Sequence, residues 1–160
     1  MAIKVGDRIP TVNLRYMAAD GIKEMSTKEL FGGKKVVVFA LPGAFTPTCS
    51  AKHLPGFVQH ADEIKAKGVD AIACIAVNDA FVMGAWGKNQ NAGDKVIMLA
   101  DGNADFTKAV GLELDATGFG MGLRSQRYAM VVDNGVVKTL AVEDGPGLDV
   151  SAAEKILAKL

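Results

Sequence analysis

Cys49 lies in the stretch whose residue types most clearly indicate chemistry, LPGAFTPTCS at positions 41–50. The stretch joins a predicted strand to a predicted helix, with Thr46 as the expected N-cap and Pro47 at the first helical position. Cys49 then falls in the first turn, where free N–H groups and the helix dipole favour a negative charge. A thiolate is the nucleophilic form of cysteine, so Cys49 is a candidate nucleophile. An inert cysteine buried beneath a capped helix is the alternative that these residues leave open.

The second cysteine, Cys74, lies in the apolar run AIACIA and is expected to be buried in a strand. The two cysteines form no CxxC and no Cys/His ligand pattern. We therefore expect neither a structural metal nor a disulfide framework, and no motif indicates another cofactor. His53 follows Cys49 by one helical turn, which leaves open a Cys–His nucleophile pair of the kind found in cysteine hydrolases.

The elements that must position these residues alternate between strand-like and helical patterns, which indicates an α/β fold. Val36–Leu41 and Asp70–Val77 are apolar on both faces and are predicted to be central strands. A helix predicted over Thr46–Lys67 connects them as a βαβ unit. The next predicted elements are a helix, a strand and a short helix, at Asp79–Lys88, Val96–Leu99 and Ala104–Val110.

Turn and cap signals delimit the rest of the chain. Asp20-Gly21 and Asn134-Gly135 each predict a hairpin, one at the amino terminus and one over Tyr128–Val142. Capping boxes are expected for two helices, at Ser26/Glu29 and Ser151/Glu154, and GFGMG at 118–122 is expected to be a loop. A thioredoxin-like α/β fold accounts for this order, with a mixed central sheet flanked by helices and an N-terminal hairpin.

Composition limits the classes of function. We expect one domain over residues 1–160, since a chain of 160 residues fits one hydrophobic core. Its 18 basic and 18 acidic side chains cancel, so no nucleic-acid partner is expected. No apolar run approaches the ~20 residues of a membrane span. The charged start MAIKVGDRIP does not look like a signal peptide, so we expect a cytoplasmic protein.

Three of these residues carry a family resemblance. Pro42, Thr46 and Cys49 match the signature Pro-x-x-x-Thr-x-x-Cys of peroxiredoxins, and PGAFTPTCS followed by KHLPGF resembles the atypical type 5 (plant type II) branch. The resemblance continues through CIAVNDAFVMGAW at 74–86 and RSQRYAMVVDNG at 124–135. It therefore extends over nearly the whole chain.

The resemblance implies a thiol-dependent peroxidase that reduces hydrogen peroxide and organic hydroperoxides through a sulfenic acid on Cys49. It further implies that Thr46 orients the peroxide, that Pro42 shields the sulfur, and that an arginine holds the thiolate and the peroxide together. The matching string assigns that arginine to Arg127, with Arg124 as the competing candidate.

The resemblance also bears on recycling. Two-cysteine members of this branch carry a resolving cysteine near the carboxyl end, where this chain has Val150. We therefore expect a one-cysteine cycle in which glutathione or glutaredoxin reduces Cys49. Thioredoxin as direct reductant, with Cys74 as the resolving cysteine, is the alternative.

Two further expectations concern partners and the runner-up class. The family implies a homodimer, with Phe45, Phe119 and Leu148 as candidates for an apolar rim at the contact. Ordinary core packing of these three residues stays open. A non-catalytic thioredoxin-like binding module is the alternative function from another class.

Overall fold

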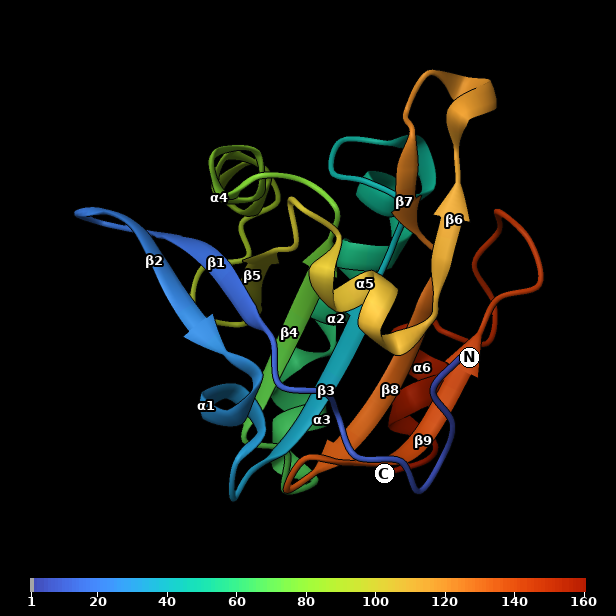
Figure 1. Ribbon diagram of the computed structural model, residues 1–160. Helices are drawn as coiled ribbons and strands as arrows, with labels where there is room; N and C mark the ends of the chain where they lie inside the picture. Colours follow the sequence, from blue (N-terminus) through green and yellow to red (C-terminus); the bar gives the residue numbers. More distant parts are fainter. Residues whose placement is uncertain (1) are drawn as a thin grey trace.

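A seven-stranded mixed sheet forms the centre of the molecule, in a computed structural model that describes residues 2–160. Its strands are β1 (Asn13–Ala18), β2 (Gly21–Ser26), β3 (Lys35–Ala40), β4 (Ala71–Ala76), β5 (Ile97–Ala100), β8 (Tyr128–Asp133) and β9 (Val136–Val142). Their order is β2-β1-β5-β4-β3-β8-β9 (Figure 1). β3, β4 and β5 run parallel, whereas β1 and β8 pair antiparallel to this centre.

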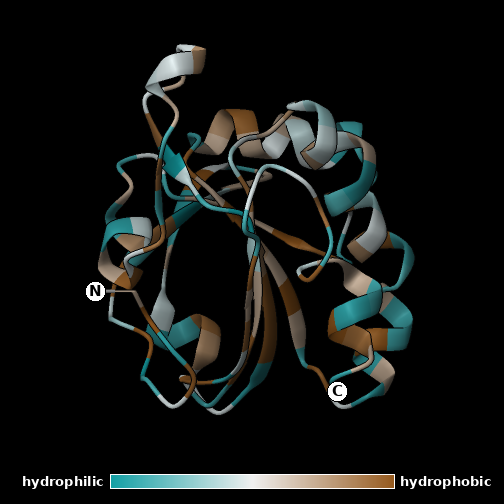
Figure 2. Cartoon of the chain, turned by 90° about the vertical axis from the view of Figure 1, so that its right-hand side faces the viewer, coloured by the Kyte–Doolittle hydropathy of each residue, from teal (hydrophilic) through white to brown (hydrophobic). Residues whose placement is uncertain are grey.

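Helices cover both faces of the sheet (Figure 2). They are α1 (Thr27–Phe31), α2 (Leu54–Gln59), α3 (Ala61–Ala66), α4 (Ala80–Asn89), α5 (Asp105–Val110) and α6 (Ala153–Leu157). Successive residues of β3 point to opposite faces, so Val37 and Phe39 join the core under α2, α3, α4 and α6. Val36 and Val38 join the second core, under α1 and α5. The expected α/β fold with a mixed sheet is confirmed, and its architecture is thioredoxin-like.

Both predicted hairpins form. β1 pairs with β2 through a turn at Ala19-Asp20, one residue earlier than predicted, because Gly21 already pairs with Ala18. β8 pairs with β9 around Asn134-Gly135. Asn134 and Gly135 have φ of 48° and 81°, the left-handed conformation that a type I′ turn requires at both central residues. The capping box of α1 is also present, because the Ser26 hydroxyl accepts from the Glu29 N–H and the Glu29 carboxylate accepts from the Ser26 N–H.

A second, two-stranded sheet was not predicted. β6 (Glu113–Asp115) pairs antiparallel with β7 (Leu123–Ser125), and a short 3₁₀ helix, η2 (Thr117–Phe119), lies between them. The predicted GFGMG loop overlaps the end of this 3₁₀ helix and forms the tip of the hairpin, which projects from the body (Figure 1). Strands of three residues are too short to show a period of two, so the sequence carried no signal for them.

The helix predicted over Thr46–Lys67 is not a single α-helix. It begins at Pro47, passes through a π-helical turn, η1 (Cys49–His53), and continues as α2 and α3. In the π-turn the Leu54 N–H donates to the Cys49 carbonyl oxygen, five residues back. Pro55 follows directly; it has no N–H for the carbonyl one turn before it, and its ring would clash there. This turn of the helix therefore contains one residue more than an α-helical turn.

The capping box predicted at Ser151/Glu154 is wrong. α6 has Ala152 as its N-cap, without a side-chain cap bond. The Ser151 hydroxyl instead donates to Glu143 Oε2 at 2.7 Å, and Glu154 pairs with His60 Nε2 at 3.5 Å. Tertiary partners thus replace the local ones that the spacing suggested.

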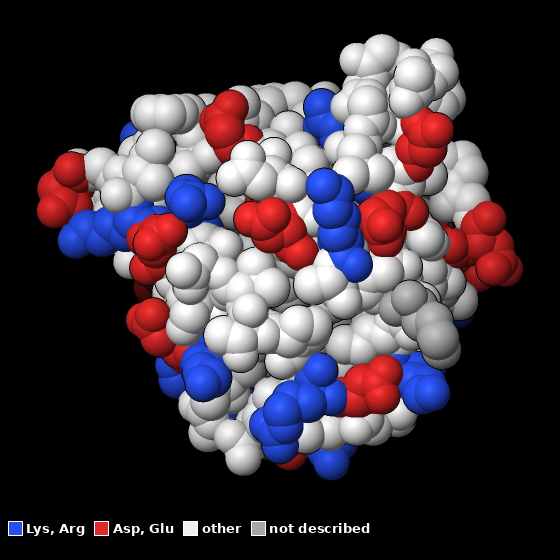
Figure 3. All heavy atoms as spheres, in the orientation of Figure 1, with Lys and Arg blue, Asp and Glu red and all other residues white. Residues whose placement is uncertain are grey.

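The molecular surface carries both charge signs. Lysine and arginine side chains alternate with aspartate and glutamate over the face shown in Figure 3. In residues 2–160 no helix is long and apolar enough to cross a membrane.

Candidate active site

Cys49 lies where the chain leaves the carboxyl end of β3 and enters the following helix, the position at which open α/β sheets usually bind ligands. Its side chain is buried. The first helical hydrogen bond runs from the Ser50 N–H to the Thr46 carbonyl at 2.9 Å. The N–H groups of Thr48 and Cys49 precede this bond, in the turn where N–H groups have no acceptor within the helix. Cys49 therefore lies in the turn whose N–H groups have no acceptor within the helix.

Arg127, in the short link between β7 and β8, contacts the sulfur. Its Nη2 donates to Cys49 Sγ at 3.3 Å, and the residue is only 5% exposed. Its buried Nε–H has no protein acceptor among residues 2–160. The competing candidate, Arg124, instead donates to the carbonyl oxygens of Met121 at 3.0 Å and Pro42 at 3.3 Å. Of the two arginines, Arg127 is the one that contacts Cys49.

His53 binds the other terminal nitrogen, Nη1, of the Arg127 guanidinium. Its Nδ1 lies 2.9 Å from Arg127 Nη1, and its Nε2 lies 3.1 Å from the Ser151 carbonyl oxygen. Burial, followed by the positive charge of Arg127, lowers the pKa of His53 to about 3. The ring is therefore neutral, with Nδ1 accepting from Arg127 and Nε2–H donating to Ser151. Both nitrogens have partners other than the sulfur, so the Cys–His pair left open by the sequence is not formed.

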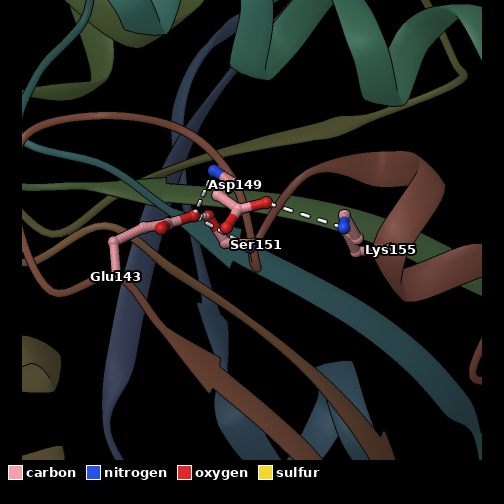
Figure 4. Close-up of polar contacts among 4 residues, drawn as sticks. All are labelled: Glu143, Asp149, Ser151 and Lys155. Carbon is pink, nitrogen blue, oxygen red and sulfur yellow. Dashed lines mark hydrogen bonds and ion pairs between the residues drawn. The ribbon is translucent and has the colours of Figure 1, made fainter.

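Glu143, which follows β9, binds the segment that carries Ser151 (Figure 4). Its Oε2 accepts from the Asp149 N–H at 2.8 Å, the Ser151 N–H at 2.9 Å and the Ser151 hydroxyl at 2.7 Å. Burial alone would raise the pKa of this carboxyl, but the hydrogen bonds from Asp149, Ser151 and the Val150 N–H together lower it. Glu143 could not be found from the sequence, because a contact across a Gly/Pro loop has no fixed spacing.

Pro42 and Thr46 shape the loop in front of the cysteine. The Thr46 hydroxyl donates to the Gly43 carbonyl oxygen at 2.7 Å, and residues 2–160 contain no helix N–H that donates to this hydroxyl. The side-chain cap predicted for Thr46 is therefore absent. Gly43 is packed tightly, since a Cβ there would lie 2.8 Å from Arg124 Nη1. The loop therefore packs against Arg124 of β7 at both Pro42 and Gly43.

Comparison with known proteins agrees with this geometry. Residues 4–157 match the Redoxin family model. The chain is 52% identical to peroxiredoxin-2E-2, chloroplastic, from Oryza sativa subsp. japonica, over 99% of this chain and 72% of that protein. A solved structure of reduced Prx3 from Vibrio vulnificus in complex with hydrogen peroxide is 58% identical, with a TM-score of 0.94 and 98% of each chain covered. Peroxiredoxin 5 from Alvinella pompejana is 37% identical, with a TM-score of 0.86, over 98% of this chain and 96% of that one.

The chain belongs to the peroxiredoxin family. Its similarity to plant type II members and to a peroxiredoxin 5 assigns it to the type II/type 5 branch, which confirms the subfamily predicted from the sequence. It is accordingly a thiol peroxidase, an oxidoreductase that reduces peroxides. In residues 2–160 no cluster of three His, Cys, Asp or Glu side chains could hold a metal ion.

The second cysteine of this peroxiredoxin lies in the middle of the sheet. Cys74 is fully buried in β4, which pairs with β3 on one side and β5 on the other. Burial, and then the neighbouring Cys49, raise the pKa of its thiol well above the ordinary value. Cys74 is therefore protonated at neutral pH and is a poor nucleophile in this conformation.

The exposed aromatic side chains of this peroxiredoxin include one that lies four residues before Cys49. Phe45 is 53% exposed and Phe119, at the tip of the β6–β7 hairpin, is 87% exposed. Leu148 is partly buried. The ring of Phe45 lies 6.4 Å from that of Trp86, whose indole N–H donates to the Ser50 hydroxyl at 2.9 Å. The single tryptophan is thus bonded to the residue next to Cys49.

Proposed function

We propose that Cys49 is the peroxidatic residue, with Arg127, Thr46 and Pro42 as its catalytic partners, acting on hydrogen peroxide and small organic hydroperoxides. One observation carries the proposal: the buried guanidinium of Arg127 lies 3.3 Å from Cys49 Sγ. A positive charge beside the sulfur favours its thiolate form, which is the nucleophile. The buried sulfur favours small substrates.

The reaction is a displacement at oxygen. The Cys49 thiolate attacks one peroxide oxygen, the O–O bond breaks, and the other oxygen leaves as hydroxide or alkoxide and takes up a proton. The sulfur is oxidised to sulfenic acid while the peroxide is reduced to water or an alcohol. Negative charge grows on the leaving oxygen, and donors placed beforehand stabilise it. The unpaired Arg127 Nε–H and the Cys49 N–H are the donors that this site offers.

We further propose a one-cysteine cycle recycled by glutathione or glutaredoxin. Cys74 is held in a central strand and Val150 replaces the carboxyl-terminal cysteine, so neither position offers a ready thiol. Glutathione would condense with the sulfenic acid and release water, and a second thiolate would then break the mixed disulfide. Cys49 is buried, so glutathione requires the turn at 46–53 to open first. Thioredoxin with Cys74 as the resolving cysteine would require a larger distortion of β4.

The remaining parts of the proposal concern assembly and location. Phe45, four residues before Cys49, and Phe119, at the tip of the β6–β7 hairpin, expose apolar surface, which supports a homodimer whose contact includes them. A reducing cytoplasm would supply the thiols for this cycle, and the cytoplasmic location stays a prediction. Because the family has peroxidase activity, we do not favour the alternative of a non-catalytic binding module.

Mass spectrometry of the wild type and of Cys74→Ser tests both steps of the cycle. One equivalent of peroxide should add one oxygen to Cys49 in both proteins, and glutathione should then convert this species to a Cys49 adduct. Both should turn over equally with glutathione and glutaredoxin. Oxygen added to Cys74 would contradict the assignment of Cys49. Loss of turnover in Cys74→Ser with intact first oxidation would make Cys74 the resolving residue.

A further inference from the structure

A continuous series of hydrogen bonds connects the Glu143 carboxylate with the reactive sulfur. Glu143 Oε2 accepts from Ser151, the Ser151 carbonyl accepts from His53 Nε2, and His53 Nδ1 accepts from Arg127 Nη1. Arg127 Nη2 completes the series at Cys49 Sγ. The Glu143 N–H also donates to the Arg127 carbonyl oxygen at 2.9 Å, so the first and fourth members are joined by backbone as well.

The Glu143 carboxylate binds the far end of the loop that carries Ser151. Residues 144–147 read DGPG, are exposed, and make no strand pairing. The three bonds to Glu143 Oε2 close this loop, as Figure 4 shows for the side chains around it. The other carboxylate in Figure 4, that of Asp149, pairs with exposed Lys155 at 3.6 Å. Hydrogen bonds to a carboxylate are stronger than neutral ones, so the Glu143 contacts outweigh this surface ion pair.

The orientation of the His53 ring depends on the Ser151 carbonyl. Phe39 and Phe57 flank the ring, with centroids at 5.0 and 5.7 Å, and offer no hydrogen bond. The charged groups that face His53 are the Arg127 guanidinium and, behind Ser151, the Glu143 carboxylate, while the Cys49 sulfur is bonded to Arg127. The Ser151 carbonyl is thus the acceptor that fixes the proton on Nε2, and this leaves Nδ1 free to accept from Arg127.

We propose that Glu143 is a positioning residue for the peroxidatic step, because it locks Ser151 so that His53 holds Arg127 against Cys49. Glu143 itself does not contact the sulfur. The inference rests on the proposed role of Arg127. Removing a residue that orients a reactive group without contacting the substrate lowers activity by on the order of 10- to 100-fold. The loss in a Glu143 variant cannot exceed that in Arg127→Gln, through which it acts.

Stopped-flow oxidation by hydrogen peroxide measures the effect, with the fluorescence of Trp86 as signal. Glu143→Ala should lower the second-order rate constant by on the order of 10- to 100-fold. Glu143→Gln keeps an acceptor oxygen and should recover part of the rate, and Ser151→Ala, which loses one of three bonds, should lose less than Glu143→Ala. Lys155→Ala removes only the surface ion pair and should react as the wild type does. Equal rates in Glu143→Ala, Glu143→Gln and the wild type would overturn the proposal.

A double-mutant cycle separates positioning from a general structural effect. If Glu143 acts through Arg127, Glu143→Ala should cost almost nothing in an Arg127→Gln background. Additive losses in the double variant would overturn the proposal. Should Glu143→Ala fail to fold, Glu143→Gln or Ser151→Ala enters the same cycle. A wild-type rate in Arg127→Gln would instead refute the proposed role of the arginine, so the two failures are distinguishable.

The His53 ring gives a readout that altered stability alone would not move. Its pKa is held at about 3 mainly by burial. When the loop opens in Glu143→Ala, water reaches the ring and its pKa should rise toward the ordinary value of about 6.5. Arg127 still lowers this pKa, and the variant lacks the negative charge of Glu143, which raises it, so the rise is partial. NMR titration should then show His53 protonating at a higher pH in Glu143→Ala than in the wild type, with an added fall in rate at low pH. Glu143→Gln keeps the loop closed and should show neither change. A His53 titration in Glu143→Ala identical to that of the wild type would overturn the proposal.

Discussion

The buried neutral ring of His53 should make the folded protein sensitive to mild acid. Its pKa is about 3 in the folded state, whereas an unfolded chain restores the ordinary value of about 6.5. Between these two pH values the unfolded state binds one more proton than the folded state. The free energy of unfolding therefore rises with pH through this window, and the stability is lost as the pH falls below about 6.5.

The size of this loss follows from proton linkage. Lowering the pH from 7.5 to 5 should cost about 2 kcal/mol from His53 alone. This free-energy loss at pH 5 hardly depends on the pKa of His53 in the folded state, because the ring stays neutral at pH 5 whether that pKa is 3 or a unit higher. Other groups also titrate: burial raises the pKa of Asp101, which opposes the loss, whereas the lowered pKa of Glu143 adds to it at more acidic pH. A variant that lacks only the imidazole separates His53 from these groups.

Urea unfolding of the reduced protein at pH 7.5 and pH 5 is the assay, with His53→Gln as the variant. The difference in unfolding free energy between the two pH values should be smaller in His53→Gln than in the wild type by about 2 kcal/mol. His60→Gln, at the half-buried second histidine, controls for replacing a histidine as such. The reasoning is refuted if His53→Gln and the wild type lose the same free energy between pH 7.5 and pH 5.

Two further predictions concern the arginines and the assembly. Arg127→Gln should slow oxidation of Cys49 by on the order of 10²-fold or more, while Arg124→Gln, whose bonds go to backbone carbonyls, should stay near the wild-type rate in stopped-flow assays. The reverse result would show that Arg124 is the catalytic arginine. Sedimentation at micromolar concentration should show a dimer, and Phe119→Asp should shift it toward monomer; a wild-type monomer would contradict the proposed contact.

The sequence allowed prediction of those parts that repeat with a regular period or carry a contiguous motif. β3 and β4 were predicted because all their residues except Lys35 are apolar, which requires two covered faces. The turn at Asn134-Gly135 was predicted because few residue pairs accept positive φ twice. The resemblance singled out Arg127, far from Cys49 in sequence, because its string was recognisable. The structure then placed its Nη2 3.3 Å from the sulfur.

The parts that could not be predicted depend on contacts between distant segments. Ser151 satisfies the spacing rule for a capping box, but Glu143 is a charged acceptor and binds its hydroxyl instead. His53 could be read as a base beside Cys49 until the guanidinium and the Ser151 carbonyl were seen to occupy both nitrogens. Local spacing lists the partners that a side chain could have. Which of them it binds is decided by the tertiary structure.

The π-turn at η1 has a consequence for which mutations this segment can accept. A π-turn contains one residue more than an α-turn, so the helix beyond it is rotated by about 100° relative to an uninterrupted one. Ala51 and Lys52 lie in this turn with exposed side chains, and substitutions there should be tolerated. Deleting either residue is different, because it would restore regular winding and turn Cys49 away from Arg127 while α2 stays packed on the sheet. These exposed positions should therefore accept substitutions but neither insertions nor deletions, whether natural or engineered.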